Sequence, residues 1–149
     1  MKFTDGYWKV QEDVTLYQVI EAGEMQVGEN SITFFAAAGQ NGRKDLGGVT
    51  LTVTLSAPKE NCISVKIVHY IGQKYEDTSF YQNEDCGEVS IDGENAILVS
   101  GKMKAVIKRK GQWKIDFFYD GKYVTGNGWR STGYGVFNDG RKYIKEELN

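Results

Sequence analysis

The stretch Val49-Thr50-Leu51-Thr52-Val53-Thr54-Leu55-Ser56 alternates without interruption between aliphatic and hydroxyl side chains. Because successive side chains of a strand point to opposite faces of a sheet, this alternation predicts a strand with one apolar face and one hydroxyl-bearing face. The next run, residues 63–70, alternates in the same way. Pro58 and the polar residues 59–61 connect the two runs, so the middle of the chain predicts two consecutive strands.

The segment 102–125 predicts a three-stranded meander. Lysines alternate with apolar residues in its first part, residues 109–112 predict a turn, and the alternation resumes at Trp113. Asp120-Gly121 then predicts a two-residue hairpin turn, because this pair readily adopts the positive φ angles that such turns require. A similar turn is predicted at Asp92-Gly93, earlier in the chain.

Two runs in the first forty residues, 14–22 and 31–38, fit either a strand or a short helix. β-Branched and aromatic residues dominate both runs and no good helix cap precedes either, so we expect strands. Glycine occurs 18 times in the 149 residues and proline once, which is typical of chains with many glycine-containing hairpin turns. With no internal repeat and no flexible linker, the sequence predicts one all-β domain, residues 1–149, built as a sandwich or a barrel.

The composition excludes several classes of protein. Forty per cent of the residues are apolar and the formal net charge is −2, which excludes a disordered chain and argues against a dedicated nucleic-acid binder. No run of ~18 apolar residues occurs, and the start, Met1–Gly6, lacks the apolar stretch of a secretion signal. We therefore expect a cytoplasmic protein that does not enter a membrane.

The residues that could hold a metal or form a disulfide are few. One histidine and two cysteines cannot form a zinc site with ordinary ligand spacing, so we expect no metal and no cofactor. In a cytoplasmic chain of this size, Cys62 and Cys86 are expected to be free thiols.

No local motif points to catalysis. His69 continues the apolar register of the strand before it and is expected to be hydrogen-bonded at the edge of the core, because no serine or cysteine motif accompanies it as a nucleophile. No pair of carboxylates is placed by a local motif, so no catalytic residue is assigned. A cluster of glycines matches no phosphate-binding loop and is better explained by loop or turn geometry. Its members are Gly126, Gly128, Gly133 and Gly135.

Aromatic rings are the residues best suited to binding, since a sugar ring can stack on them. The chain has three tryptophans and nine tyrosines, most of which are expected to pack in the core or at an interface. Trp113 lies on the apolar register and is expected to be buried. Trp129, surrounded by glycine and polar residues, is the best exposed candidate for binding carbohydrate.

A locally basic hairpin, residues 102–114, follows an acidic stretch, residues 84–94. Nucleic-acid binding is one interpretation of the basic residues. The favoured interpretation is that opposite charges on neighbouring strands pair across the sheet.

Three stretches, Met1–Trp8, Ile63–Tyr70 and Gly111–Gly121, follow one another as similar stretches do in bacterial α-xylosidases and related α-glucosidases of glycoside hydrolase family 31. Nearly the whole chain resembles that family, but the resemblance is to the N-terminal domain of the family only. The resemblance implies an antiparallel β-sandwich of the galactose mutarotase-like type. In the family, a segment containing Tyr-Gly-Leu-Gly-Glu-Arg follows the counterpart of Tyr143–Asn149. The resemblance therefore implies an excised domain that lacks the last strands of its sandwich.

The family resemblance also implies a role. Its catalytic aspartates lie in a (β/α)₈ barrel and have no counterpart in residues 1–149, so the chain is expected to be non-catalytic. The barrel of the same parent chain would be its partner, an α-linked oligosaccharide the substrate of that parent, and self-association a further expectation. The alternatives from other classes are a freestanding carbohydrate-binding sandwich that uses Trp129, and a nucleic-acid-binding barrel that uses the basic hairpin.

Overall fold

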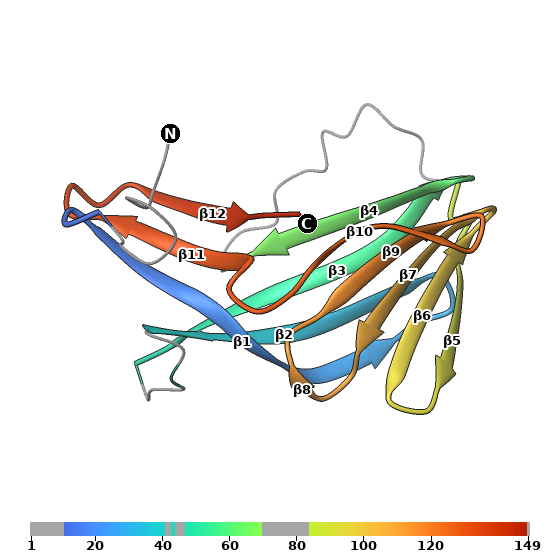
Figure 1. Ribbon diagram of the computed structural model, residues 1–149, viewed down its shortest axis with the longest axis horizontal. Coiled ribbons are helices and arrows are strands. Elements are labelled where there is room, and N and C mark those ends of the chain that lie inside the picture. The colour runs from blue at the N-terminus through green and yellow to red at the C-terminus, as the bar shows by residue number, and fades with distance from the viewer. Residues whose placement is uncertain (1–10, 41–42, 44–46, 70–83, 149) are drawn as a thin grey trace.

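Twelve antiparallel strands form most of the part of the chain that the computed structural model describes, which is residues 11–40, 43, 47–69 and 84–148 (Figure 1). No α-helix occurs in those residues, and none of them forms a helix that could cross a membrane. The all-β prediction is confirmed.

The strands form two sheets. The first sheet follows the order β12 (Lys142–Glu146), β11 (Thr132–Phe137), β1 (Val14–Val27), β2 (Ser31–Gly39), β3 (Val49–Lys59) and β4 (Cys62–Val68), and β8 (Gly111–Gln112) also pairs with β1. The second sheet follows the order β10 (Lys122–Asn127), β9 (Ile115–Tyr119), β7 (Met103–Lys108), β6 (Asn95–Ser100) and β5 (Glu88–Asp92). In Figure 1 the second sheet covers one half of the first, and β11 and β12 lie beyond its edge. The predicted sandwich is therefore confirmed.

The core lies between the two sheets and follows the period of two in the sequence. On β3, Leu51, Val53 and Leu55 are fully buried, whereas the threonines between them face outward. Across the first sheet, Val53 pairs with Phe34 on one side and Ile67 on the other. The second sheet contributes its own apolar side chains, which are Ala96, Leu98, Ala105, Ile107, Ile115 and Phe117. The alternation read from residues 49–56 thus corresponds to one wall of the core.

The two ambiguous runs near the N-terminus are strands, as expected. They form β1 and β2, which pair with each other from Gln18 to Val27 of β1 and from Ile32 to Gly39 of β2. Two irregularities in the register, between Val19 and Glu21 and between Ala22 and Met25, fall in β1. Such bulges bend a strand and increase its twist.

The first sheet curls until its two ends approach each other. β4 and β11 are separated in the sheet order by β1, β2 and β3. Nevertheless, the rings of His69, which directly follows β4, and Tyr134 on β11 have centroids 4.3 Å apart. The imidazole Nδ1 of His69 also lies 3.3 Å from the carbonyl oxygen of Thr50. These contacts agree with the prediction of a hydrogen-bonded histidine at the edge of the core.

The predicted turn between residues 109 and 112 is partly wrong. Gly111 and Gln112 form β8, which pairs with Ala22 and Glu21 of β1 in the other sheet. The chain then returns to the second sheet at Ile115. The meander is therefore interrupted where β8 leaves the second sheet and pairs with the first. The local sequence pattern could not reveal this pairing, because the residues of β1 that pair with β8 lie about 90 positions away.

The glycine cluster also needs a correction, because Gly126 lies in strand β10 and Gly133 and Gly135 lie in strand β11, not in a loop. A β-carbon on Gly133 would lie 2.8 Å from the carbonyl oxygen of Tyr17. A β-carbon on Gly135 would collide with the ring of Tyr143. These two glycines are therefore explained by close packing against β1 and β12.

Both cysteines are unpaired, as expected. Cys62 is exposed at the start of β4, and Cys86 is half-buried before β5. Partial burial, followed by the nearby Glu84 carboxylate, raises the pKa of the Cys86 thiol.

The turn at Asp120-Gly121 has the predicted geometry, with φ of 49° at Asp120 and 75° at Gly121. We expect Gly121→Val to lower the free energy of unfolding by at least ~1 kcal/mol, because a β-branched residue is strained at positive φ. Chemical denaturation measures this effect. Gly47→Val is the matched control, since its β-carbon would meet open space and its φ is not positive. Equal denaturation midpoints for wild type and Gly121→Val would contradict the turn assignment.

Candidate functional site

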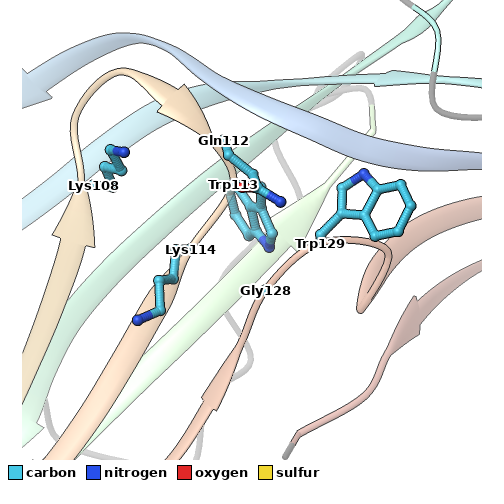
Figure 2. A pocket seen from close by; sticks show the side chains of 6 residues that line it. All are labelled: Lys108, Gln112, Trp113, Lys114, Gly128 and Trp129. Atoms are coloured by element: carbon cyan, nitrogen blue, oxygen red, sulfur yellow. The ribbon is translucent and has the colours of Figure 1, made fainter.

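A pocket of about 250 Å³ lies between two tryptophan side chains, Trp113 and Trp129 (Figure 2). Its other described lining residues are Lys108, Gln112, Lys114 and Gly128. They come from the end of β7, from β8 and the residues after it, and from the connection between β10 and β11. The pocket thus lies where the chain passes from one sheet to the other.

Trp113 forms the buried wall of this pocket. Its backbone N–H donates to the carbonyl of Ile20 at 3.0 Å, which continues the pairing of β8 with β1. Because the chain rejoins the second sheet two residues later, the indole is held between the layers, 1% exposed, with its ring centroid 5.6 Å from that of Phe34. The expectation that Trp113 belongs to the core is confirmed.

Trp129 forms the opposite, exposed wall and is 50% exposed, as the sequence predicted. It lies in a four-residue turn, in which the N–H and hydroxyl of Ser131 donate to the carbonyl of Gly128 at 3.1 and 2.7 Å. Arg130 holds the third position of this turn with φ of 67°. Glycine normally takes that conformation, so the arginine stores strain there.

Two contacts hold Arg130 in this conformation. The ammonium of Lys145 donates to the Arg130 carbonyl at 3.2 Å. The guanidinium carbon of Arg130 lies 4.0 Å from the centroid of the Trp129 ring, within the range of a cation–π contact. One ring of the pocket is therefore oriented by its own neighbour in the chain.

Four buried polar atoms without a hydrogen-bond partner among the described residues belong to Trp113 or to residues within three positions of Trp129 in the chain. They are Trp113 Nε1, Asn127 Oδ1, Arg130 Nε and Thr132 Oγ1. The large majority of buried side-chain polar atoms in folded proteins have a hydrogen-bond partner, so these four atoms are exceptions. The orientation of the Asn127 amide is fixed, because its Nδ2 donates to Glu146 Oε1 at 3.0 Å.

The charges beside the pocket are largely compensated. Lys114 forms an ion pair with Asp116, with Nζ 2.7 Å from Oδ2, and this hydrogen bond raises the pKa of the lysine. In Figure 2 the side chain of Lys114 extends away from the two indoles. Lys102, elsewhere on the basic hairpin, lies 3.8 Å from Asp120. These two lysines pair with the carboxylates of Asp116 and Asp120, which lie outside the acidic stretch.

The ionisable side chains that line the described part of the pocket are those of Lys108 and Lys114. None of its described lining residues is a carboxylic acid, a histidine or a cysteine. No group of three His, Cys, Asp or Glu side chains suited to a metal occurs among the described residues either. Two indoles and an amide supply a stacking surface and hydrogen-bonding groups.

The other residues considered from the sequence lie elsewhere. His69 packs on Tyr134, whose ring centroid lies 6.4 Å from that of Tyr17. Tyr17 in turn lines a second hollow of about 290 Å³ with Gln40, Gly47 and Gly48. Trp8 lies outside the described residues. Sequence reasoning missed Gln112 as a neighbour of Trp129, and its only signal was the break in alternation just before Trp113.

Comparison with known proteins gives relatives for part of their length only. The chain is 30% identical over 131 residues to the α-xylosidase XylQ of Lactiplantibacillus pentosus, a match that covers 84% of this chain and 17% of that protein. It is 25% identical over 173 aligned positions to an α-xylosidase of Emericella nidulans, covering 100% of this chain and 22% of that protein. No protein-family model matches the chain. The chain therefore corresponds to a small part of two much longer α-xylosidases.

Solved structures show the same fold. Two structures of an uncharacterized protein of Listeria monocytogenes superpose on 84% of this chain with TM-scores of 0.62 and 0.63. One of them contains α-D-glucose, β-D-glucose, magnesium and calcium. The match covers 11% of that protein at 13% and 12% identity, so it describes the architecture alone.

Proposed function

We propose that this chain, a homologue of a small part of two α-xylosidases, is the non-catalytic N-terminal domain of a longer α-glycosidase of glycoside hydrolase family 31. The observation that carries the proposal is the pair of matches that cover most or all of this chain and only 17% and 22% of the relatives. The parent enzyme acts in the cytoplasm on α-xylosides or α-glucosides. It cleaves with retention through two carboxyl groups ~5–5.5 Å apart, both of them in its catalytic barrel.

The domain supports that barrel and shapes one edge of the substrate pocket. Its rigid two-sheet core suits a supporting role, because a densely packed sandwich transmits position from one surface to another. Exposed apolar side chains at the β9–β10 turn offer a surface for contact with the barrel or with another subunit. These are Tyr119, Tyr123 and Val124, which are 45%, 54% and 57% exposed. We propose that exposed apolar side chains at this turn take part in such a contact.

A second candidate function is that of a freestanding carbohydrate-binding sandwich. One observation favours it, namely that the exposed Trp129 lines a pocket with a second tryptophan. Indole rings supply the flat apolar surface on which sugar rings pack. This candidate differs from the first in requiring no further domain.

The isolated chain is expected to show no turnover of aryl α-xylosides or α-glucosides, because no pair of carboxyl groups lines its Trp113–Trp129 pocket. A chromogenic assay with the purified 149-residue chain measures this, with an active α-xylosidase as the positive control. Turnover that a point substitution within residues 1–149 abolishes would contradict the non-catalytic role. Absence of turnover with tight Trp129-dependent sugar binding would favour the second candidate.

A further inference from the structure

We infer that the pocket between Trp113 and Trp129 is a subsite for one ring of a neutral saccharide, stacked on Trp129 and hydrogen-bonded by the amide of Gln112. The inference deepens the proposed function, and its choice of α-linked sugars for the test rests on that function. The site itself is assigned from the geometry of four residues, which are Gln112, Trp113, Trp129 and Arg130.

The first observation is the size and shape of the pocket. A volume of about 250 Å³ is just below the range of ~300–1,000 Å³ that is typical of sites for drug-sized ligands. It therefore suits a single ring and not a long chain of them. Figure 2 shows the indoles of Trp113 and Trp129 on either side of the pocket, with the Gln112 side chain beside Trp113 and its end directed toward Trp129.

The second observation is that the turn that carries Trp129 has a strained backbone at Arg130. A positive φ at a non-glycine residue is retained only where the surroundings determine it, and such residues concentrate at ligand-binding sites. Here Arg130 has that conformation, and its guanidinium lies over the Trp129 ring. The contact restrains the rotation of the indole, so less side-chain entropy is lost when a ligand stacks on it.

The third observation concerns the hydrogen-bonding groups. The exposed amide of Gln112 carries one acceptor and two donors, and therefore matches a pair of neighbouring hydroxyls, each of which can donate and accept. The indole Nε1 of Trp113 is buried, so it is not among the groups that a ligand in the pocket would contact. A hydroxyl-rich ligand fits the mixed donors and acceptor of the Gln112 amide better than a purely accepting anion does.

The charges favour a neutral ligand as well. Lys114 is already paired with Asp116 at 2.7 Å and extends away from the indoles. The guanidinium of Arg130 is engaged on the Trp129 ring. Of the described residues that line the pocket, Lys108 is therefore the one cation without a described ion pair, which is too little for tight binding of a phosphate or a carboxylate.

The test is a titration of the complete ¹⁵N-labelled 149-residue chain with α-xylosyl-(1→6)-glucose and with maltose. We expect the indole N–H signal of Trp129 to shift with saturation at millimolar concentration, as is usual for a single-ring contact. Trp129→Ala should weaken binding at least tenfold, and Gln112→Ala should weaken it several-fold. Tyr123→Ala, which removes an exposed aromatic ring outside the pocket, is the matched control and should leave the affinity unchanged.

Three results would overturn the inference. The first is the absence of any shift of the Trp129 signal. The second is an affinity that Trp129→Ala leaves intact. The third is tighter binding of glucuronate or glucose 6-phosphate that depends on Lys108, which would make the pocket an anion site.

Failure of the subsite and failure of the proposed function remain distinguishable. If the chain binds no sugar while its deletion inactivates the longer enzyme, the subsite is wrong and the supporting role stands. If Trp129 binds sugar while deletion leaves the enzyme fully active, the subsite stands and the supporting role is wrong.

Discussion

Trp113→Ala is expected to lower the free energy of unfolding by about 3–5 kcal/mol, the usual cost of truncating a large buried aromatic residue. Its indole is 1% exposed and packs on Phe34. Because it lies where the chain crosses between the sheets, its loss leaves a cavity shared by both layers. We therefore expect the loss in the free energy of unfolding to lie near the upper end of that range of about 3–5 kcal/mol. Chemical denaturation followed by tryptophan-independent circular dichroism measures it.

Phe35→Ala is the matched control for this experiment. Phe35 is the next residue after Phe34 on β2, faces away from the core, and is 40% exposed. We expect its truncation to cost less than ~1 kcal/mol, as for most surface substitutions. Equal losses for the two variants would show that the indole of Trp113 does not join the layers.

The second large effect is expected in the longer enzyme. Deleting residues 1–149 from the parent polypeptide should lower its rate on aryl α-xyloside to background, although both carboxyl groups of the proposed mechanism would remain. The physical reason is position, because displacing reacting groups by ~1 Å can cost a hundredfold in rate. Initial rates at equal concentrations of folded protein measure the effect. Turnover at the undiminished rate after deletion would exclude a supporting role for the domain.

Much of the fold follows from local pattern alone. The alternation in residues 49–56 and the turn at Asp120-Gly121 each specify their structure through side-chain direction or backbone φ, and neither depends on distant partners. The two runs near the N-terminus could be assigned as strands for a related reason, since β-branched and aromatic residues favour a pleated sheet. Such features are readable because their causes are local.

The errors concern features whose causes are distant. Gly111 and Gln112 form a strand only because they meet β1, far away in the sequence, at Glu21 and Ala22, beyond the stretch of β1 that pairs with β11. Gly133 and Gly135 are required by neighbours on β1 and β12, and their spacing alone suggests a loop. Both cases are tertiary effects that no local period contains.

The candidate site shows the same division. The exposure of Trp129 follows from its glycine and polar neighbours in the sequence, and the burial of Trp113 follows from its register. The two indoles line one pocket because β8 pairs with β1 of the other sheet, and this pairing was not predictable from the sequence. The strained Arg130 and the buried unpaired polar atoms become visible only in three dimensions.

The most direct test of the central claim is reconstitution in trans. The parent polypeptide lacking residues 1–149 is mixed with increasing amounts of the separately purified chain, and hydrolysis of aryl α-xyloside is followed. If the chain is a supporting domain of an α-glycosidase, the rate rises from background and saturates as the chain is added, while the chain alone remains inactive. A deletion variant that is fully active without the chain, or a chain that hydrolyses the substrate by itself, would contradict the account.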